Sequence, residues 1–221
     1  MLVDIDGVSL FYKQSGSGDP LLLLHGNSED SGIFDVISEK LRGHFSVLAL
    51  DSRNHGKSQR TEDISYGAMA GDVVGFIRKL DLGQVFVVGF SDGAIIALMV
   101  AMGHPGLIRR MVLLGPNMSP DDLTDEAREF IQGLAEEHDS RLFRMILSEP
   151  NLLPADLARI DTPSLLVFGQ NDLFKPGTAA AMAQALPNST LKIMPGHDHL
   201  SYVVGQDIMF PDIMSFFGRK G

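Results

Sequence analysis

Short apolar runs alternate with helical patterns along this chain, and that alternation restricts the possible folds more than any other feature. An alternating apolar and polar segment, Val8–Gln14, comes first. Continuous apolar runs typical of strands buried on both faces follow at Pro20–Leu24, Val47–Leu50, Val85–Val88, Met111–Leu114, Leu165–Phe168 and Leu191–Met194. Helical patterns lie between or after them at Ser31–Leu41, Tyr66–Leu80, Ala94–Met102, Thr178–Leu186 and Val203–Phe217. The alternation predicts an α/β fold with a mostly parallel central sheet flanked by helices.

One segment, residues 117–162, interrupts this order. It is rich in charge and shows helical spacing at Leu123–His138 and Arg141–Leu147, with no evident strand. We interpret it as a small helical cap insertion in a single domain spanning residues 1–221, because 221 residues suffice for one sizeable core and not two. Its apolar residues are Phe130, Ile131, Leu134, Phe143, Met145 and Ile146. We favour the interpretation that they pack against the main sheet as a seam; the alternative is that they line a cleft.

Charge and composition exclude several function classes. With 18 Lys and Arg against 28 Asp and Glu, the net charge is −10, and no basic run offers a footprint for nucleic acid or an anionic membrane. There is no cysteine, which removes disulfides, thiolate metal sites and cysteine nucleophiles. No run approaches the ~20 apolar residues of a membrane span, and Asp4 and Asp6 stand where a signal peptide would be apolar. We expect a cytoplasmic protein with a small-molecule substrate.

The sharpest motif is Gly89-Phe90-Ser91-Asp92-Gly93, a G-x-S-x-G pattern between a predicted strand and a predicted helix. A serine nucleophile in this context sits on a tight turn, and the flanking glycines let neighbouring backbone approach closely. Ser91 is therefore the candidate nucleophile. The backbone N–H of Asp92 is a candidate oxyanion donor, because it lies at the start of the following helix.

A second motif, His25-Gly26-Asn27, follows the apolar run that ends at Leu24. This segment is similar to the one that supplies the other oxyanion-hole N–H in α/β-hydrolases, so the Asn27 backbone is the second candidate donor. We expect the His25 imidazole to be structural and to bond a nearby loop carbonyl.

A serine nucleophile needs a base, and the base needs an orienting acid. Asp172 and His199 both follow predicted strands, in the order Ser91, Asp172, His199. His197 is the alternative base, although His199 is favoured. Asp198 is the alternative acid, but its place beside the histidine suits it poorly to orient the ring. A metal pair formed by His197 and His199 lacks partners at a matching spacing, so no metal is expected.

Together these motifs resemble the α/β-hydrolase fold superfamily over nearly the whole chain. The resemblance also covers Asp51-Ser52-Arg53-Asn54-His55-Gly56-Lys57-Ser58, similar to a D-x-R-G-x-G-x-S pattern, with Asn54 in place of glycine. Asn tolerates a left-handed backbone better than most residues, so the turn can persist. Ser91 argues against the dehalogenase branch of the superfamily, whose nucleophile is an aspartate. The family pattern P-G-x-x-H aligns Pro195, Gly196 and His199, which favours His199 over His197 as the base. The superfamily covers many reactions.

The resulting expectation is a serine hydrolase that cleaves an ester-like substrate, a carboxylic ester, thioester or lactone, through an acyl-enzyme intermediate and without a cofactor. Perhydrolase or lyase chemistry on the same triad and a ligand-binding receptor remain alternatives. The Asp92 side chain either caps its helix, the favoured role, or pairs with a cationic substrate at the cleft mouth. The small insertion favours short, uncharged or cationic esters. The oligomeric state stays open.

Overall fold

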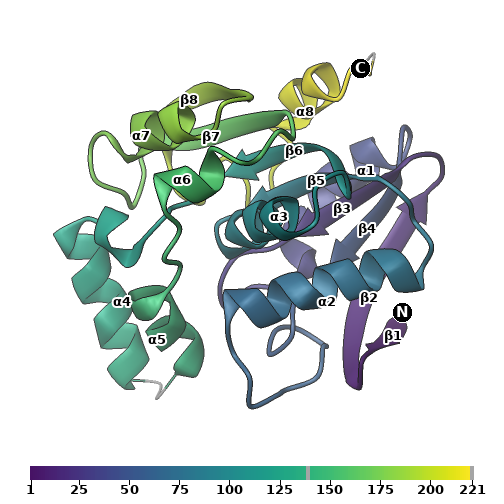
Figure 1. Cartoon of the computed structure of the whole chain (residues 1–221), viewed down its shortest axis with the longest axis horizontal. Coiled ribbons are helices and arrows are strands. Elements are labelled where there is room, and N and C mark those ends of the chain that lie inside the picture. Colours follow the sequence, from purple (N-terminus) through teal and green to yellow (C-terminus); the bar gives the residue numbers. More distant parts are fainter. Residues whose placement is uncertain (138–139, 220–221) are drawn as a thin grey trace.

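The computed structural model describes residues 1–137 and 140–219 of the chain, which form one eight-stranded sheet with helices on both faces (Figure 1). Residues 138–139 and 220–221 lie outside this description, and so does the predicted helix end at His138. The strands are β1 (Leu2–Ile5), β2 (Val8–Gly16), β3 (Pro20–Leu24), β4 (Ser46–Leu50), β5 (Val85–Phe90), β6 (Ile108–Leu114), β7 (Ser164–Asn171) and β8 (Ser189–Asp198).

The sheet order is β1-β2-β4-β3-β5-β6-β7-β8. The pairs β1–β2 and β2–β4 are antiparallel, and all other neighbours are parallel. The α/β fold with a mostly parallel sheet is thus confirmed. Since β3, β5, β7 and β8 run in the same direction, the loops after them emerge at one edge of the sheet, where open α/β sheets bind ligands.

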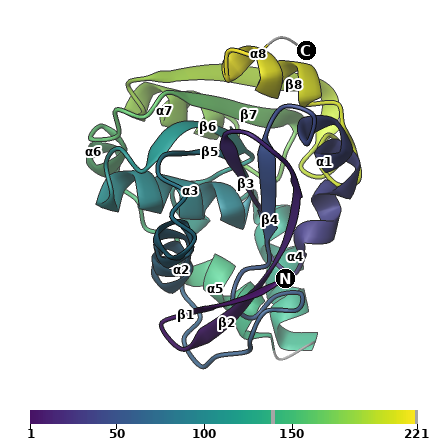
Figure 2. The same cartoon turned by 90° about the vertical axis from the view of Figure 1, so that its right-hand side faces the viewer.

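The helices are α1 (Asp35–Leu41, preceded by a 3-10 turn at Ser31–Phe34), α2 (Tyr66–Lys79), α3 (Asp92–Gly103), α4 (Asp125–Glu137), α5 (Arg141–Ser148), α6 (Pro154–Leu157), α7 (Thr178–Ala185) and α8 (Phe210–Phe216). Figure 2 shows α1 and α8 on one side of the sheet and α2 and α3 on the other. Each side has its own apolar core: one buries side chains of α2, α3 and α7, and the other those of α1 and α8. No described helix is long and apolar enough to cross a membrane.

One strand was missed and the start of one helix was wrong. Strand β1 was not expected, since its residues are largely exposed and it lies at the sheet edge with only β2 as a neighbour. The helix expected over Val203–Phe217 begins only at Phe210. Gly205 has a left-handed backbone, φ +64°, which ends the preceding turn, and Pro211 occupies the first turn of α8, where its missing N–H costs nothing.

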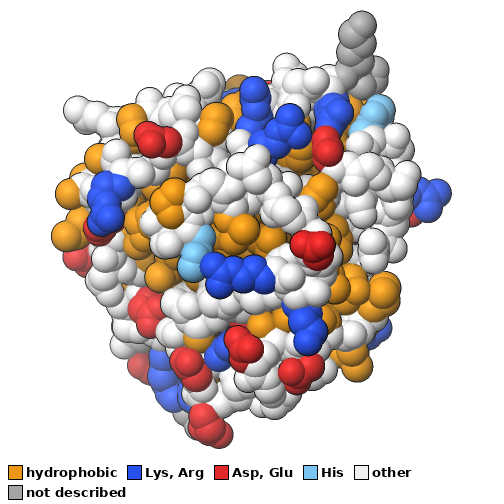
Figure 3. All heavy atoms as spheres, turned by 45° about the vertical axis from the view of Figure 1, so that its right-hand side comes forward, with side chains coloured by type: hydrophobic (Ala, Val, Ile, Leu, Met, Phe, Trp, Pro, Cys, Tyr) orange, Lys and Arg blue, Asp and Glu red, His pale blue; other side chains and the backbone are white. Residues whose placement is uncertain are grey.

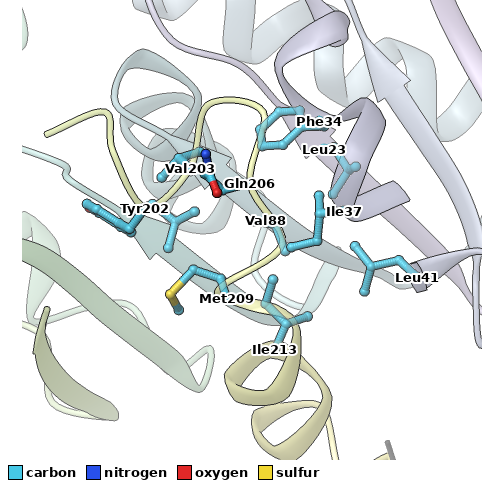
Figure 4. A pocket seen from close by; sticks show the side chains of 11 residues that line it. Leu23, Phe34, Ile37, Leu41, Val88, Tyr202, Val203, Gln206, Met209 and Ile213 are labelled. Atoms are coloured by element: carbon cyan, nitrogen blue, oxygen red, sulfur yellow. The ribbon is translucent and has the colours of Figure 1, made fainter. Parts of the chain in front are cut away.

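A small cavity of about 10 Å³ lies between the sheet, α1 and α8 (Figure 4). Its lining is almost entirely apolar, with the Gln206 side chain as the main polar contribution. A space this size is at the lower limit for one water molecule, and a water there would lack polar partners. The cavity is a packing gap and not a ligand site. On the face in Figure 3, acidic and basic side chains are scattered among apolar ones.

Candidate active site

Ser91 occupies a sharp turn between β5 and α3 at the carboxyl edge of the sheet. Its backbone has φ +50° and ψ −114°, a conformation that non-glycine residues rarely adopt, and its N–H donates to Leu114 O at 2.8 Å. A Cβ built on Gly93 would lie 2.0 Å from Leu24 O, and one on Gly89 would lie 2.5 Å from Gly93 O. Only glycine therefore permits the close backbone contact that supports this turn.

Gly93→Ala is expected to lower the free energy of unfolding by about 3 kcal/mol, because the new methyl group would overlap the Leu24 carbonyl and neither backbone can move away freely. Urea unfolding measures the change. Gly71→Ala is the matched control: Gly71 lies on the exposed side of α2 with nothing within 4 Å of an added Cβ, so alanine should stabilise the helix by about 1 kcal/mol. An unfolding midpoint for Gly93→Ala at or above that of the wild type would contradict this account.

His199 and Asp172 reach Ser91 from the loops that follow β8 and β7. His199 Nε2 lies 3.1 Å from Ser91 Oγ, and His199 Nδ1 lies 2.6 Å from Asp172 Oδ1. Asp172 also accepts hydrogen bonds from the N–H groups of Gly169, at 2.9 Å, and Leu173, at 2.8 Å. Because the Asp172 carboxylate accepts a hydrogen bond from Nδ1–H and so keeps the proton on Nδ1, Nε2 is free to accept the hydroxyl proton of Ser91.

The His199 ring is held in place by packing as well. It is 5% exposed, with the rings of Phe90 and Phe174 at centroid distances of 5.0 and 5.6 Å. A Cβ at Gly115 would lie 2.7 Å from His199 Cε1, so the ring lies directly on the Gly115 backbone. This packing keeps the imidazole oriented between Ser91 and Asp172.

The alternative base and acid lie elsewhere. His197 Nδ1 contacts Ser201 Oγ at 3.1 Å, whereas the histidine that contacts Ser91 Oγ is His199. Asp198 Oδ1 accepts from the N–H groups of Leu200 and Ser201, and these bonds lower the pKa of that carboxyl. The structure therefore brings together Ser91, Asp172 and His199, and not the residues considered as substitutes.

Of the two candidate oxyanion donors, Asp92 follows Ser91 directly in the chain and Asn27 lines the same cleft as Ser91. Neither the Asn27 N–H nor the Asp92 N–H has an acceptor within residues 1–137 and 140–219. The Asn27 side chain, by contrast, is fully used: its Nδ2 donates to Asp92 Oδ2 at 3.0 Å and to Leu142 O of α5 at 3.2 Å. This arrangement holds the Asn27 loop between the start of α3 and α5.

Both roles suggested for the Asp92 side chain were wrong. Its helix begins without a side-chain cap, and the carboxyl is 4% exposed rather than at the cleft mouth. Its two oxygens accept from Tyr66 OH, at 2.8 Å, and from Asn27 Nδ2. Burial raises the pKa of Asp92 to about 6 in spite of these bonds. Tyr66, expected only as the first residue of a helix, is therefore part of the support for this site.

A cleft of about 390 Å³ opens above Ser91 and His199. Its other lining residues are Asn27, Glu29, Phe90, Ala127, Phe130, Ile131, Leu134, Phe143, Ile146, Leu173, Asp198 and Leu200. Five of the six apolar residues singled out in the insertion are among them, so the favoured seam interpretation was wrong for those five. Of the six, Met145 packs into the main core, while the other five, from α4 and α5, line the cleft.

The alpha/beta hydrolase fold model, a sequence family, matches residues 19–143. The chain belongs to this family. It is 35% identical over 114 residues to a 2-(acetamidomethylene)succinate hydrolase of Mesorhizobium japonicum, covering 51% of this chain and 41% of the relative. It is 34% identical over 108 residues to a putative esterase/lipase of Haemophilus influenzae, and this match covers 49% of this chain and 37% of the relative. The chain thus spans about two fifths of the length of the curated relatives that it matches.

The fold comparison extends further than these sequence matches. The crystal structure of an E-2-(acetamidomethylene)succinate hydrolase superposes with a TM-score of 0.84 at 22% identity, covering 99% of this chain and 98% of that one. The architecture is therefore shared over the whole chain. The curated relatives in this family are named as hydrolases, esterases or lipases.

Two further features of the family framework are as expected. His25 Nδ1 lies 2.7 Å from Gly26 O, and its Nε2 accepts from Ser52 N–H at 3.0 Å, which fits a neutral ring whose pKa is lowered by burial. Asn54 adopts the left-handed conformation at φ +67°. Glu29, in contrast, was not considered at all, although it lies two residues after the His25-Gly26-Asn27 motif.

Proposed function

We propose that this protein is a serine hydrolase that cleaves small ester-like substrates, such as carboxylic esters, thioesters or lactones, through an acyl-enzyme intermediate. The observation that carries the proposal is the hydrogen-bonded chain Ser91–His199–Asp172, which opens on an apolar cleft beside two backbone N–H groups without acceptors. A serine needs each of these parts to act as a nucleophile on a carbonyl group.

In the acylation step, Ser91 Oγ bonds to the carbonyl carbon while His199 Nε2 takes the hydroxyl proton. The carbonyl oxygen becomes an anion, which the Asn27 and Asp92 N–H groups stabilise. Asp172 stabilises the imidazolium, which then gives its proton to the departing alcohol, thiol or hydroxyl oxygen as the tetrahedral intermediate collapses. A water oxygen then bonds to the acyl carbon while His199 Nε2 takes its proton, and His199 passes that proton to Ser91 Oγ as the bond between Oγ and the acyl carbon breaks and the carboxylic acid leaves.

The cleft supports a mainly apolar substrate. Its volume of about 390 Å³ lies within the range of small-molecule sites, and aliphatic and aromatic side chains make up most of its lining. No Lys or Arg occurs among the lining residues of the described chain, whereas two carboxyl groups, Glu29 and Asp198, do. A dicarboxylate of the succinate type, as in the name of one relative, is therefore a poor fit for this cleft.

Labelling of the wild-type protein with a fluorophosphonate, followed by intact mass spectrometry, tests the proposal, together with turnover of a panel of p-nitrophenyl esters, thioesters and lactones. We expect stoichiometric labelling and release of the carboxylic acid. A folded protein that is neither labelled nor active on any ester would remove the hydrolase assignment and favour a ligand-binding role. Product analysis with and without added peroxide separates hydrolysis from perhydrolysis.

Asp172→Asn is expected to lower kcat for ester hydrolysis by about 10⁴-fold, because an amide at this position no longer fixes the Nδ1–H tautomer or stabilises the imidazolium. Asp198→Asn is the matched control at the end of β8, beside His199: its acceptor oxygen can still receive the Leu200 and Ser201 N–H groups, so the loss should stay below about tenfold. Equal losses in the two variants would argue against Asp172 as the orienting acid.

A further inference from the structure

We infer that Glu29 is a specificity residue of this cleft and that it selects ester-like substrates carrying a positively charged ammonium group. The inference rests on the proposed hydrolase function and deepens it by naming the charge class of the substrate. A cationic substrate was considered from the sequence, but with Asp92 as its partner, and that carboxyl is buried beneath Tyr66 and Asn27.

Glu29 is held in a fixed position on the wall of the cleft. It lies in the loop after β3, lines the same space as Ser91 and His199, and its Oε2 accepts from the Gly26 N–H at 3.0 Å. A Cβ on Gly26 would lie 2.8 Å from that oxygen, so the absence of a side chain there lets the carboxyl approach closely. Oε1 makes no hydrogen bond or ion pair within residues 1–137 and 140–219. One oxygen thus fixes the group while the other is available to a ligand.

No basic side chain neutralises Glu29. It forms no ion pair with the Lys and Arg residues of the described chain, and the charged or titratable groups that act on it are His199, Asp92 and Asp30. Burial is the main cause that raises the pKa of Glu29 to about 7. Above this pKa the cleft holds a partly buried carboxylate without a counterion, and a substrate cation would supply the missing charge.

The rest of the cleft suits a cation that is weakly hydrated. Phe90, Phe130 and Phe143 line the space, and aromatic faces attract ammonium groups, quaternary ones in particular. Asp198 contributes less, since its carboxylate is already occupied by two backbone N–H groups and lies in solvent, where charge is screened. Glu29 is accordingly the carboxyl that can distinguish a cation from a neutral group of equal shape.

Two pairs of substrates that differ only in charge test this. In the first, the cation is in the leaving group: acetylthiocholine against S-(3,3-dimethylbutyl) thioacetate. In the second, it is in the acyl group: the p-nitrophenyl ester of 4-(trimethylammonio)butanoic acid against that of 5,5-dimethylhexanoic acid. For at least one pair we expect the wild-type kcat/KM to favour the cation by about tenfold at pH 8, and Glu29→Gln to bring the ratio close to one.

Glutamine retains an oxygen for the Gly26 N–H, so this variant removes the charge and leaves the loop contact in place. Glu39→Gln, on the exposed surface of α1 and outside the cleft, makes the same change in net charge and should leave the ratio unchanged. Inhibition of a neutral ester's hydrolysis by choline and by 3,3-dimethylbutanol provides a second measurement. In the wild type choline should inhibit more strongly than 3,3-dimethylbutanol. In Glu29→Gln the two compounds should inhibit equally.

The dependence on pH follows from the same group. Above its pKa Glu29 is ionised and attracts the cation, so the cation-to-neutral ratio should rise between about pH 6 and 8 and fall as Glu29 is protonated. The effect of pH on the catalytic steps themselves is the same for both substrates of a pair, so it cancels in the ratio. A ratio of one for both pairs, or a preference that Glu29→Gln leaves intact, would overturn the inference while the hydrolase proposal stands. Failure of labelling and of all turnover would instead remove the hydrolase proposal, and this inference with it.

Discussion

Ser91→Ala is expected to lower kcat for ester hydrolysis by about 10⁶-fold, to the level supplied by substrate binding and the oxyanion donors alone. The Ser91 hydroxyl is the group that would bond to the substrate carbon, and its only described side-chain partner is His199 Nε2 at 3.1 Å. Steady-state turnover of the best ester from the panel measures the loss, and fluorophosphonate labelling should disappear with it.

Two checks accompany this variant. Its circular dichroism and urea unfolding should match the wild type, since a hydroxyl at a half-buried position is removed without loss of packing. Ser17→Ala, at an exposed position in the turn before β3, should keep full turnover and labelling. Labelling that persists in Ser91→Ala would mean that another serine or threonine reacts with the probe, and the proposed mechanism would fail.

The second large effect is expected for His199→Ala, with a loss of kcat near that of Ser91→Ala, on the order of 10⁶-fold, because nucleophile and base act as a unit. His197→Ala is the matched control, since this histidine lies two residues before His199, at the end of β8, where its ring contacts Ser201 Oγ and the ring of Tyr202. Its turnover should stay within about tenfold of the wild type. The two variants together decide which histidine is the base.

Added imidazole sharpens this comparison. In His199→Ala the vacated space between Ser91 and Asp172 can accept a free imidazole, so millimolar imidazole should restore part of the turnover. The same addition should not raise the turnover of Ser91→Ala, which lacks the nucleophile. A larger loss in His197→Ala than in His199→Ala would show that the base was assigned incorrectly.

The strands of the inner sheet could be predicted because a strand buried on both faces requires a continuous apolar run. Pro20–Leu24 was predicted with the same bounds as β3, whereas β1 was missed, because an exposed edge strand has no such requirement. The start of α8 was placed too early for a related reason: apolar spacing continues through Val203, but Gly205 and Pro211 set the local backbone.

The site residues divide in the same way. Ser91, Asp172 and His199 could be proposed from motifs, because a strained turn and the ends of adjacent parallel strands have recognisable neighbours in the sequence. The roles of Asp92, Tyr66 and Glu29 could not, because each depends on which residue from a distant segment lies within hydrogen-bond reach. Asp92 meets Tyr66 across 26 positions of sequence, and Asn27 meets Leu142 across 115.

The sequence by itself determined that this protein has a mostly parallel sheet flanked by helices, that its catalytic candidates lie at one sheet edge and that it has no basic run. These features could be predicted because the spacing of apolar residues and the chemistry of turns are properties of residues that are neighbours in the sequence. Only the tertiary structure decided that α4 and α5 line a cleft, that the Asp92 carboxyl is buried and that Glu29 lines the same cleft. Those outcomes depend on desolvation and long-range hydrogen bonds, which exist only once segments far apart in the chain have packed together.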